Sequence, residues 1–277
     1  MQAAGATAKV VSLSAAQLDA KKVSLDKAVK SAPASVAGWY VDIKTNSVVA
    51  SVVGSDAAGA AWAAGHGARV ESVAQAPKPL WNLIGGQAIQ NTTARCSIAF
   101  SARSASYRYI LTAGHCGQLG GTWSGSGGVI GPVAAYNFPG DDFAAIRVTS
   151  SAAVQTALVD RYSSGADVTV AGSGVAAVGT SICRSGSTTG WHCGTIQANN
   201  QTVNYGSGRI VYGLTRTTVC AEPGDSGGAY VSPNGATRVQ AQGITSGGSG
   251  NCTSGGTTFH QPVNEALSRY GLTLVTG

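Results

Sequence analysis

The sequence predicts an all-β fold for most of the chain, preceded by a small α/β part. Glycine is abundant, at 39 of 277 residues, and charged residues are scarce, at 11%. Many short strands joined by glycine turns have this composition. The composition also changes along the chain, because lysine occurs only up to Lys78 and all six cysteines lie at or after Cys96. Pro77 and Pro79 predict extended chain at this border, so we expect two domains.

Residues 1–83, the first domain, carry helix and strand patterns in turn. Apolar spacing predicts a helix in AAQLDAKKVSLDKAVKSA, two strands in GWYVDIKTNSVVASVV, and a helix followed by a strand in DAAGAAWAAGHGARVESVA. This part contains no cysteine and no cluster of side chains suited to catalysis. We therefore expect the chemistry to lie in the second domain.

Residues 84–277, the second domain, are rich in short strand patterns bounded by glycine, asparagine or serine. The runs are RCSIAFSA, YRYILTAG, DFAAIRVT, ADVTVAGS, GRIVYGLTRTTVC, TRVQAQGITSG and TTFHQPV. One late helix is predicted in VNEALSRYG, because its apolar residues are helically spaced and Gly271 favours a left-handed cap.

Charge, cysteine count and hydropathy argue against several classes of function. The formal charge is +6, but the basic residues are scattered, without the clusters of a nucleic-acid-binding face. Six cysteines without CxxC spacing favour disulfides over zinc, and an oxidising compartment. No apolar run approaches the roughly 20 residues of a membrane span. We expect a secreted protein, its signal peptide removed, that uses no metal, cofactor, nucleic acid or membrane.

Three short stretches predict nucleophilic catalysis by serine. They are LTAGHC with His115, DDFAAIRV with Asp142 and GDSGG with Ser226. A serine hydroxyl needs a base within hydrogen-bond reach, and the base needs a third group to fix its tautomer. Alone, His115 would be a core histidine and Asp142 a turn residue. Together, in this order and with Cys116 directly after the histidine, the three stretches predict a catalytic triad.

With these stretches, residues 84–277 resemble the bacterial chymotrypsin-like serine proteases of the streptogrisin and α-lytic type. The resemblance extends over CRSGSTTGWHCGTI, CAEPGDSGG and GITSGGSGNCTSGGTTFHQPV. It implies two antiparallel six-stranded β-barrels, residues 84–165 and 166–277, with the active site between them. It also implies a monomeric, secreted endopeptidase that cleaves polypeptides through an acyl-enzyme.

Two alternatives belong to other classes of function. One is an inactive binding protein of the same fold, against which the complete triad argues. The other is an esterase, which is disfavoured because the serine of those enzymes normally precedes the acid and the histidine. In this sequence GDSGG comes last.

The resemblance explains the unusual residues around Ser226. The amides of Gly224 and Ser226 would form an oxyanion hole, where losing one donor typically costs roughly 3–4 kcal/mol of barrier. Asp225 would be a buried structural carboxylate, which needs a partner. The matching partner in the bacterial branch of the family is Arg184, although Arg184 also fits an ordinary surface charge.

The disulfide framework does not follow from the cysteines themselves, since six cysteines allow about 15 connectivities. The resemblance selects three bridges between cysteines that are neighbours along the chain, namely Cys96–Cys116, Cys183–Cys193 and Cys220–Cys252. The third bridge would form part of the frame of the substrate pocket.

The pocket for the residue before the scissile bond, P1, is predicted to be neutral. No acid occurs directly before the nucleophile loop, at Thr218 and Val219. The resemblance makes Ser246, Gly247 and Gly248 a wall of small residues that pairs with substrate as a short strand. Such a pocket favours Phe, Tyr, Leu or Met at P1.

His260 leaves a second preference open. It lies where relatives selective for glutamate place a pocket histidine. Those relatives use more than one polar pocket residue, and Thr245 and Gly248 do not obviously supply the others. We therefore expect an apolar preference, with glutamate selectivity as the alternative.

Residues 1–83 resemble the C-terminal part of the pro-region of these proteases. In that family the pro-region assists folding and then inhibits the enzyme by threading its tail through the active site. The bond Leu83–Ile84 presents a large apolar residue to an apolar pocket. We therefore expect self-processing there, or at the nearby Trp81 or Asn82.

Overall fold

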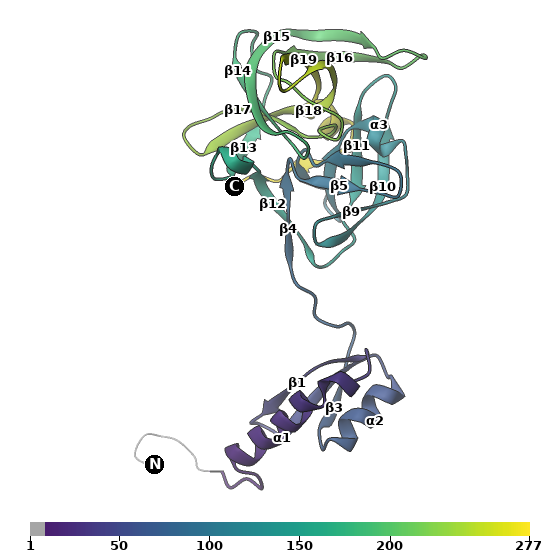
Figure 1. Cartoon of the computed structure of the whole chain (residues 1–277), viewed down its shortest axis with the longest axis vertical. Helices are drawn as coiled ribbons and strands as arrows, with labels where there is room; N and C mark the ends of the chain where they lie inside the picture. Colours follow the sequence, from purple (N-terminus) through teal and green to yellow (C-terminus); the bar gives the residue numbers. More distant parts are fainter. Residues whose placement is uncertain (1–8) are drawn as a thin grey trace. The chain divides into compact units, whose positions relative to one another are not determined.

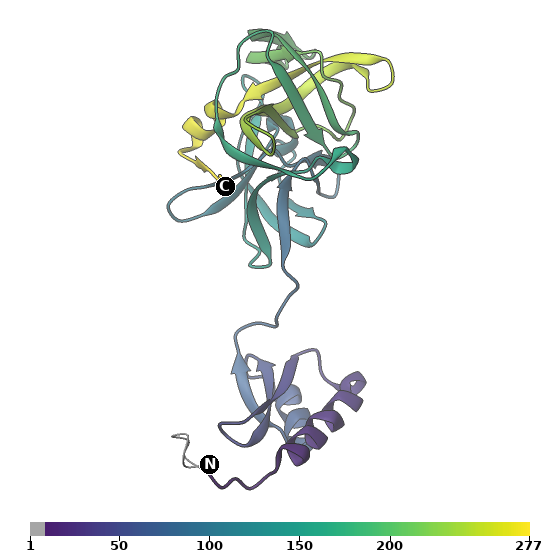
Figure 2. The ribbon, with the colours of Figure 1, turned by 90° about the vertical axis from the view of Figure 1, so that its left-hand side faces the viewer.

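The computed structural model describes residues 9–277, which divide into two compact units between Lys78 and Pro79 (Figure 1). The first unit holds two helices and a three-stranded sheet, and the second is built almost entirely of strands, as Figure 2 also shows. The border lies a few residues before the predicted one, because residues 79–83 pack with the second unit.

The first unit follows the predicted order of helix, two strands, helix and strand. Its elements are α1 (Ala15–Lys27), η2 (Val29–Ser31), β1 (Val36–Asp42), β2 (Ser47–Val53), α2 (Ala57–Gly65) and β3 (Arg69–Val73). Ser14 and Gln17 form a capping box that starts α1. Strands β1 and β2 are antiparallel, whereas β3 is parallel to β2 because α2 carries the chain back across the sheet.

The first sheet of the second unit has eight strands in the order β20-β7-β8-β11-β10-β9-β5-β6. In chain order they are β5 (Ala88–Gln90), β6 (Arg95–Ser97), β7 (Ser101–Arg103), β8 (Arg108–Thr112), β9 (Thr122–Gly125), β10 (Gly128–Asn137), β11 (Phe143–Arg147) and β20 (Thr273–Leu274). Most residues of β8 and β11 are buried, and Ile110 and Ile146 lie fully in the core.

The second sheet contains a closed ring of six strands. The ring consists of β14 (Ser181–Gly186), β15 (Gly190–Asn204), β16 (Ile210–Thr217), β19 (Gly255–Pro262), β18 (Arg238–Asn251) and β17 (Ala229–Pro233), and the pairing of β17 with β18 closes it. Three further strands extend the sheet from β18, namely β13 (Val168–Ser173), β12 (Ala153–Val159) and β4 (Trp81–Gly85). The ring is the second six-stranded barrel that the sequence led us to expect.

The two sheets exchange strands at the ends of the unit, which differs from the predicted division at residue 165. Strand β4 pairs in parallel with β12 in the second sheet, although β12 and the end of β4 belong to the part of the chain assigned to the first barrel. Strand β20 pairs with β7 in the first sheet. The division differs because pairing between distant segments, rather than position along the chain, decides the sheet.

Short helices connect the strands of the second unit. They are α3 (Gly114–Gly117), η3 (Tyr162–Ser164) and the late helix α4 (Val263–Tyr270). Helix α4 lies in the predicted stretch, and Gly271 ends it in the left-handed conformation at φ +61°. Within the described residues, no helix is long and apolar enough to cross a membrane.

All six cysteines are paired in the structure. The bridges are Cys96–Cys116, Cys183–Cys193 and Cys220–Cys252, with Cα separations from 3.9 to 6.5 Å. These are the pairs that the family resemblance selected. The first bridge joins β6 to α3, so it ties the helix that carries His115 to the neighbouring strand.

Candidate active site

His115 and Asp142 meet because β8 and β11 are antiparallel. His115 follows the end of β8, Asp142 precedes the start of β11, and Thr112 pairs with Ala144. Asp142 accepts the His115 amide at 2.9 Å and contacts Nδ1 of its ring at 3.0 Å. Gly114 permits this approach, since a Cβ there would lie 1.9 Å from the carbonyl oxygen of Asn137.

The Asp142 carboxylate is fully buried, and hydrogen bonds replace its solvent. The Ser246 hydroxyl donates to its Oδ2 at 2.5 Å, and the Asp142 amide donates to the side-chain oxygen of Gln261 at 2.9 Å. The His115 side chain is 30% exposed and reaches into the cleft. A fixed acid thus lies behind an accessible imidazole.

The charge of Asp142 tunes the His115 ring. Burial lowers the pKa of His115, and the charge of Arg209 lowers it further. The attraction and hydrogen bond of Asp142 act in the opposite direction and outweigh both, so the pKa of His115 is raised above its ordinary value. The ring is therefore a stronger base than a free histidine.

The loop that carries Ser226 packs against the turn before His115. A Cβ on Gly227 would lie 2.0 Å from the Thr112 hydroxyl, and the Ser226 carbonyl accepts the amide of Ser97 at 2.8 Å. Within residues 9–277 no hydrogen bond joins the Ser226 hydroxyl to the His115 ring. The structure therefore places the Ser226 loop against the segment that leads to His115, without a hydrogen bond between the two side chains.

Gly224 has a backbone that other residues rarely adopt, at φ +99°. A Cβ at this position would also lie 2.3 Å from the Thr188 hydroxyl. In the part of the chain that the structure describes, the amides of Gly224 and Ser226 donate no hydrogen bond to protein. Two backbone donors without a protein partner are thus available next to this serine, as the predicted oxyanion hole would require.

Asp225 lies beneath this loop and is ion-paired with Arg184. The two charged groups are 3.3 Å apart, and both side chains are fully buried. Asp225 also accepts the amides of Thr188, Thr189 and Glu222 at 2.9 to 3.1 Å. Arg184 donates to the Cys220 carbonyl at 2.9 Å. The reading of Arg184 as a surface charge is therefore wrong in this structure.

An open cleft of about 570 Å³ runs past His115. Its walls come from both sheets, and its lining residues are His115, Gln118, Leu119, Phe138, Asp142, Tyr205, Arg209, Ser246, Gly247 and Gly248. The segment Ser246 to Gly248, predicted as the substrate-binding wall, forms one side of it. The structure therefore brings the predicted wall and the predicted base to one cleft.

The other residues predicted for the P1 pocket do not line this cleft. Thr218 is exposed and accepts the Thr195 amide, whereas Val219 is fully buried in a separate apolar cluster. The Thr245 hydroxyl donates to the Gly228 carbonyl at 3.0 Å, behind the nucleophile loop. These three side chains support the backbone around the pocket instead of facing the cleft.

His260 is also buried away from the cleft. It stacks on Tyr230 with the ring centroids 4.5 Å apart, and neither ring nitrogen has a partner among the described residues. Burial lowers the pKa of His260 to about 3, so the ring is neutral at ordinary pH. A neutral, covered imidazole offers no positive charge to a carboxylate substrate.

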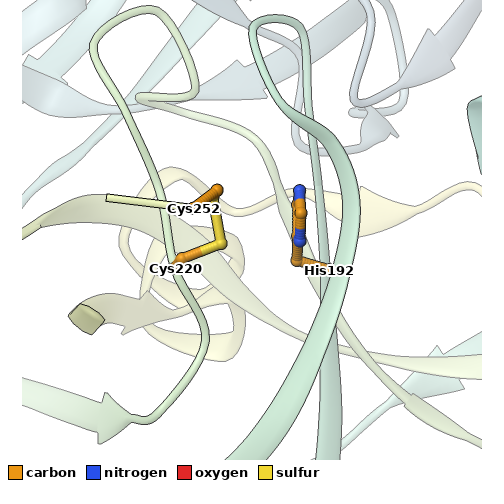
Figure 3. A group of neighbouring side chains, drawn as sticks. All are labelled: His192, Cys220 and Cys252. Atoms are coloured by element: carbon orange, nitrogen blue, oxygen red, sulfur yellow. A yellow bond between two sulfur atoms is a disulfide. The ribbon is translucent and has the colours of Figure 1, made fainter. Parts of the chain in front are cut away.

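His192 lies next to the Cys220–Cys252 disulfide, as Figure 3 shows. The spacing of the nitrogen and the two sulfurs would suit a metal ion. Zinc binds thiolates, however, and the sulfurs of an intact disulfide are not thiolates. The His192 Nε2 contacts the Thr189 carbonyl at 2.9 Å, so it helps to hold the turn whose amides bind Asp225.

The predicted processing bond Leu83–Ile84 lies inside the folded second unit. Leu83 is fully buried, and its carbonyl accepts the Thr156 hydroxyl at 2.8 Å. The predicted insertion of this tail beside Ser246 to Gly248 is not seen for residues 81–83, which pair with β12 instead. A bond inside a buried strand is not accessible to an active site, so this arrangement disfavours cleavage at Leu83–Ile84. Leu80, just before β4, is 71% exposed.

Several residues of the site were not predicted in their observed roles. Ser246 was expected to bind substrate through its backbone, but its hydroxyl also holds Asp142. Gln261, Tyr205 and Arg209 were not singled out at all. The sequence gives little signal for Gln261 and Tyr205, because they lie far along the chain from Asp142 and Ser246, the residues that they contact.

The fold and this site define a chymotrypsin-like serine protease. Residues 83–269 match the family model described as Trypsin, and residues 13–69 match the one described as alpha-lytic protease prodomain. The chain belongs to the trypsin family, and its second unit is a streptogrisin-like protease domain preceded by a prodomain.

Individual relatives agree with this assignment. Streptogrisin-C of Streptomyces griseus is 48% identical over 281 residues, which cover 99% of this chain but 60% of that protein. Glutamyl endopeptidase 2 of the same organism is 41% identical, over 69% of this chain and 99% of its own. The crystal structure of Nocardiopsis protease is 52% identical, with a TM-score of 0.65, and covers 71% of this chain and 100% of its own.

Proposed function

We propose that the chain is a secreted serine endopeptidase that works through His115, Asp142 and Ser226. The Ser226 hydroxyl attacks the peptide carbonyl while His115 takes its proton, and Asp142 holds the imidazole in the required tautomer. The amides of Gly224 and Ser226 stabilise the negative oxygen that forms. His115 then gives its proton to the leaving amine, and water hydrolyses the acyl-enzyme.

The observation that carries this proposal is the buried Asp142 carboxylate hydrogen-bonded to His115. Burying a carboxylate costs stability unless a charge or hydrogen bonds compensate it. A buried acid paired with a partly exposed histidine in a cleft is typical of an active site. The ion pair of Asp225 and Arg184 supports the second part of the mechanism, because it fixes the loop that presents the two amides.

We propose a preference for large apolar residues at P1. No acid occurs at residues 217–219, directly before the nucleophile loop. His260 is covered by Tyr230 and uncharged, which argues against recognition of a carboxylate. Glutamate selectivity remains the second candidate because glutamyl endopeptidase 2 is 41% identical.

The first unit is proposed to be a pro-region that folds and inhibits the protease and is then cut away. The match of residues 13–69 to the prodomain model supports this role. The exposed Leu80 supports cleavage at Leu80–Trp81, since leucine fits an apolar P1 pocket and β4 begins at Trp81. The mature protease would then comprise residues 81–277.

Two measurements test the proposal. A serine-reactive phosphonyl reagent should label the processed protein at Ser226, and mass analysis should find no adduct in Ser226→Ala. Absence of an adduct in the parent would favour the inactive binding protein. The parent should also yield a fragment that begins at Trp81, while Ser226→Ala stays a single chain. A mature N-terminus at Ile84 would contradict the proposed bond.

A further inference from the structure

The turn between β15 and β16 brings a positive charge to the active-site cleft. Figure 1 shows these strands as a long hairpin, and the turn that joins them contains Tyr205 and Arg209. Both residues line the cleft beside His115. The Tyr205 hydroxyl bonds to the Ser246 hydroxyl at 2.9 Å, so the turn is fixed to the substrate-binding wall.

The Arg209 guanidinium is held by its own turn and lacks a carboxylate. Its Nε and Nη2 donate to the carbonyls of Gly206 and Tyr205 at 3.2 Å each. Within residues 9–277 it forms no ion pair. Asp142 is the one carboxylate among the described lining residues, and its oxygens are already bound by His115 and Ser246. The cleft therefore carries an uncompensated cation in a defined position.

The geometry of a bound substrate decides which side chain meets this cation. A peptide paired with Ser246 to Gly248 is an extended strand, in which successive side chains point to opposite faces. If P1 enters its own pocket near Ser226, the preceding residue, P2, faces the other way. That face is walled by His115 and Phe138, whose ring centroids are 5.8 Å apart. The same cleft contains Arg209.

We propose that Arg209 makes this cleft a subsite for an acidic side chain at P2. This inference rests on the proposed peptidase function, because it assumes that substrate pairs with the wall. The guanidinium is pre-positioned by two carbonyls, so less conformational entropy is lost when a carboxylate binds. Arg209 lines the same cleft as the His115 ring, so a carboxylate bound to it would lie in the cleft that holds the base.

The size of the effect is limited by solvent. Arg209 is an exposed residue, and exposed ion pairs contribute up to about 1 kcal/mol, which is roughly a fivefold preference. We therefore expect kcat/KM for Glu at P2 to exceed that for Gln at P2 by about three- to fivefold at low salt. Salt at 1 M should reduce this ratio toward one.

The experiment compares matched peptides with processed enzyme prepared from the full chain. The peptides share one P1 residue and carry Glu or Gln at P2, P3 or P4. Arg209→Gln should abolish the Glu preference at P2, measured within each enzyme as the ratio of kcat/KM for the Glu peptide to kcat/KM for the Gln peptide, so that a change in overall rate cancels. Arg103→Gln is the matched control, because it removes the same charge from an exposed position outside the cleft.

The outcomes separate this inference from the function on which it rests. If the parent cleaves none of the peptides and shows no adduct at Ser226, the proposed function fails. If the parent cleaves them without a Glu preference at P2, only the subsite assignment fails. A Glu preference confined to P3 or P4, or one retained in Arg209→Gln, also overturns it.

Discussion

Two carboxylates are fully buried within the active-site region, and the chain treats them differently. Asp225 faces the permanent cation Arg184 and three backbone amides. Asp142 faces a histidine that can gain or lose its proton, together with the Ser246 hydroxyl. The first arrangement fixes a loop, whereas the second leaves a charge able to respond to proton transfer. The role of a buried acid is therefore indicated by the group that it contacts and not by its burial alone.

The largest expected effect is the loss of activity when Asp142 is replaced, because Asp142 is the acid proposed to act in catalysis. Asp142→Asn keeps the size of the side chain but removes the charge that stabilises protonated His115. We expect kcat to fall by about 10⁴-fold, as for the loss of the orienting acid in other triads. The thermal midpoint should change little. A peptidase assay with parallel thermal unfolding measures both, and a fall smaller than tenfold would show that Asp142 is not the orienting acid.

The second prediction concerns the structural acid. Arg184→Met leaves the buried Asp225 without its cation, which should lower the free energy of unfolding by about 3–5 kcal/mol. The double variant Arg184→Met/Asp225→Asn should recover part of this loss, since no isolated charge remains. Denaturant unfolding in a Ser226→Ala background avoids self-digestion. Equal stability with and without Arg184→Met would show that the ion pair does not stabilise the loop.

The third prediction concerns His260, a buried group that has neither a charged partner nor a hydrogen-bond partner among the described residues. His260 stays neutral in the fold with a pKa of about 3, whereas in the unfolded chain its pKa is near the ordinary histidine value of 6.5. Below pH 6.5 the unfolded state binds a proton that the folded state does not, so stability is lost as pH falls toward 3. The loss between pH 6.5 and pH 4 should be roughly 3 kcal/mol.

His260→Phe should remove this contribution, because phenylalanine keeps the stacking on Tyr230 and does not titrate. Denaturant unfolding from pH 7 to pH 4 measures the slope in both proteins. His192→Phe is the matched control, since His192 is only partly buried and contacts a carbonyl. An unchanged slope in His260→Phe would mean that other groups cause the acid sensitivity.

The sequence predicted the parts of the site that lie in short contiguous motifs. His115, Asp142 and Ser226 are recognisable from their neighbours, and Arg184 from the motif around the first cysteine of its loop. The Ser246 hydroxyl on Asp142 joins residues 104 positions apart, so no local pattern reveals it. The order of helices and strands in the first unit also followed from local periodicity.

The errors have a common physical cause. Thr218 is exposed and Val219 is buried in a separate apolar cluster, so closeness to the nucleophile loop along the chain placed neither side chain in the cleft. Leu83 looked like a substrate residue because it is large and apolar near a proline-rich linker. The same properties make it a core residue once β4 pairs with β12. Pairing between distant strands is not encoded in either segment alone.

The exchange of strands at the ends of the second unit affects how long the protease survives among its own active copies. Neither sheet is completed by one continuous stretch of chain, because β4 pairs in the second and β20 in the first. Separating the two sheets must therefore break the pairing of β4 with β12 or of β20 with β7. Cleavage of a native protein requires local or larger openings. The cross-paired end strands of the second unit resist digestion because they oppose the separation of its sheets.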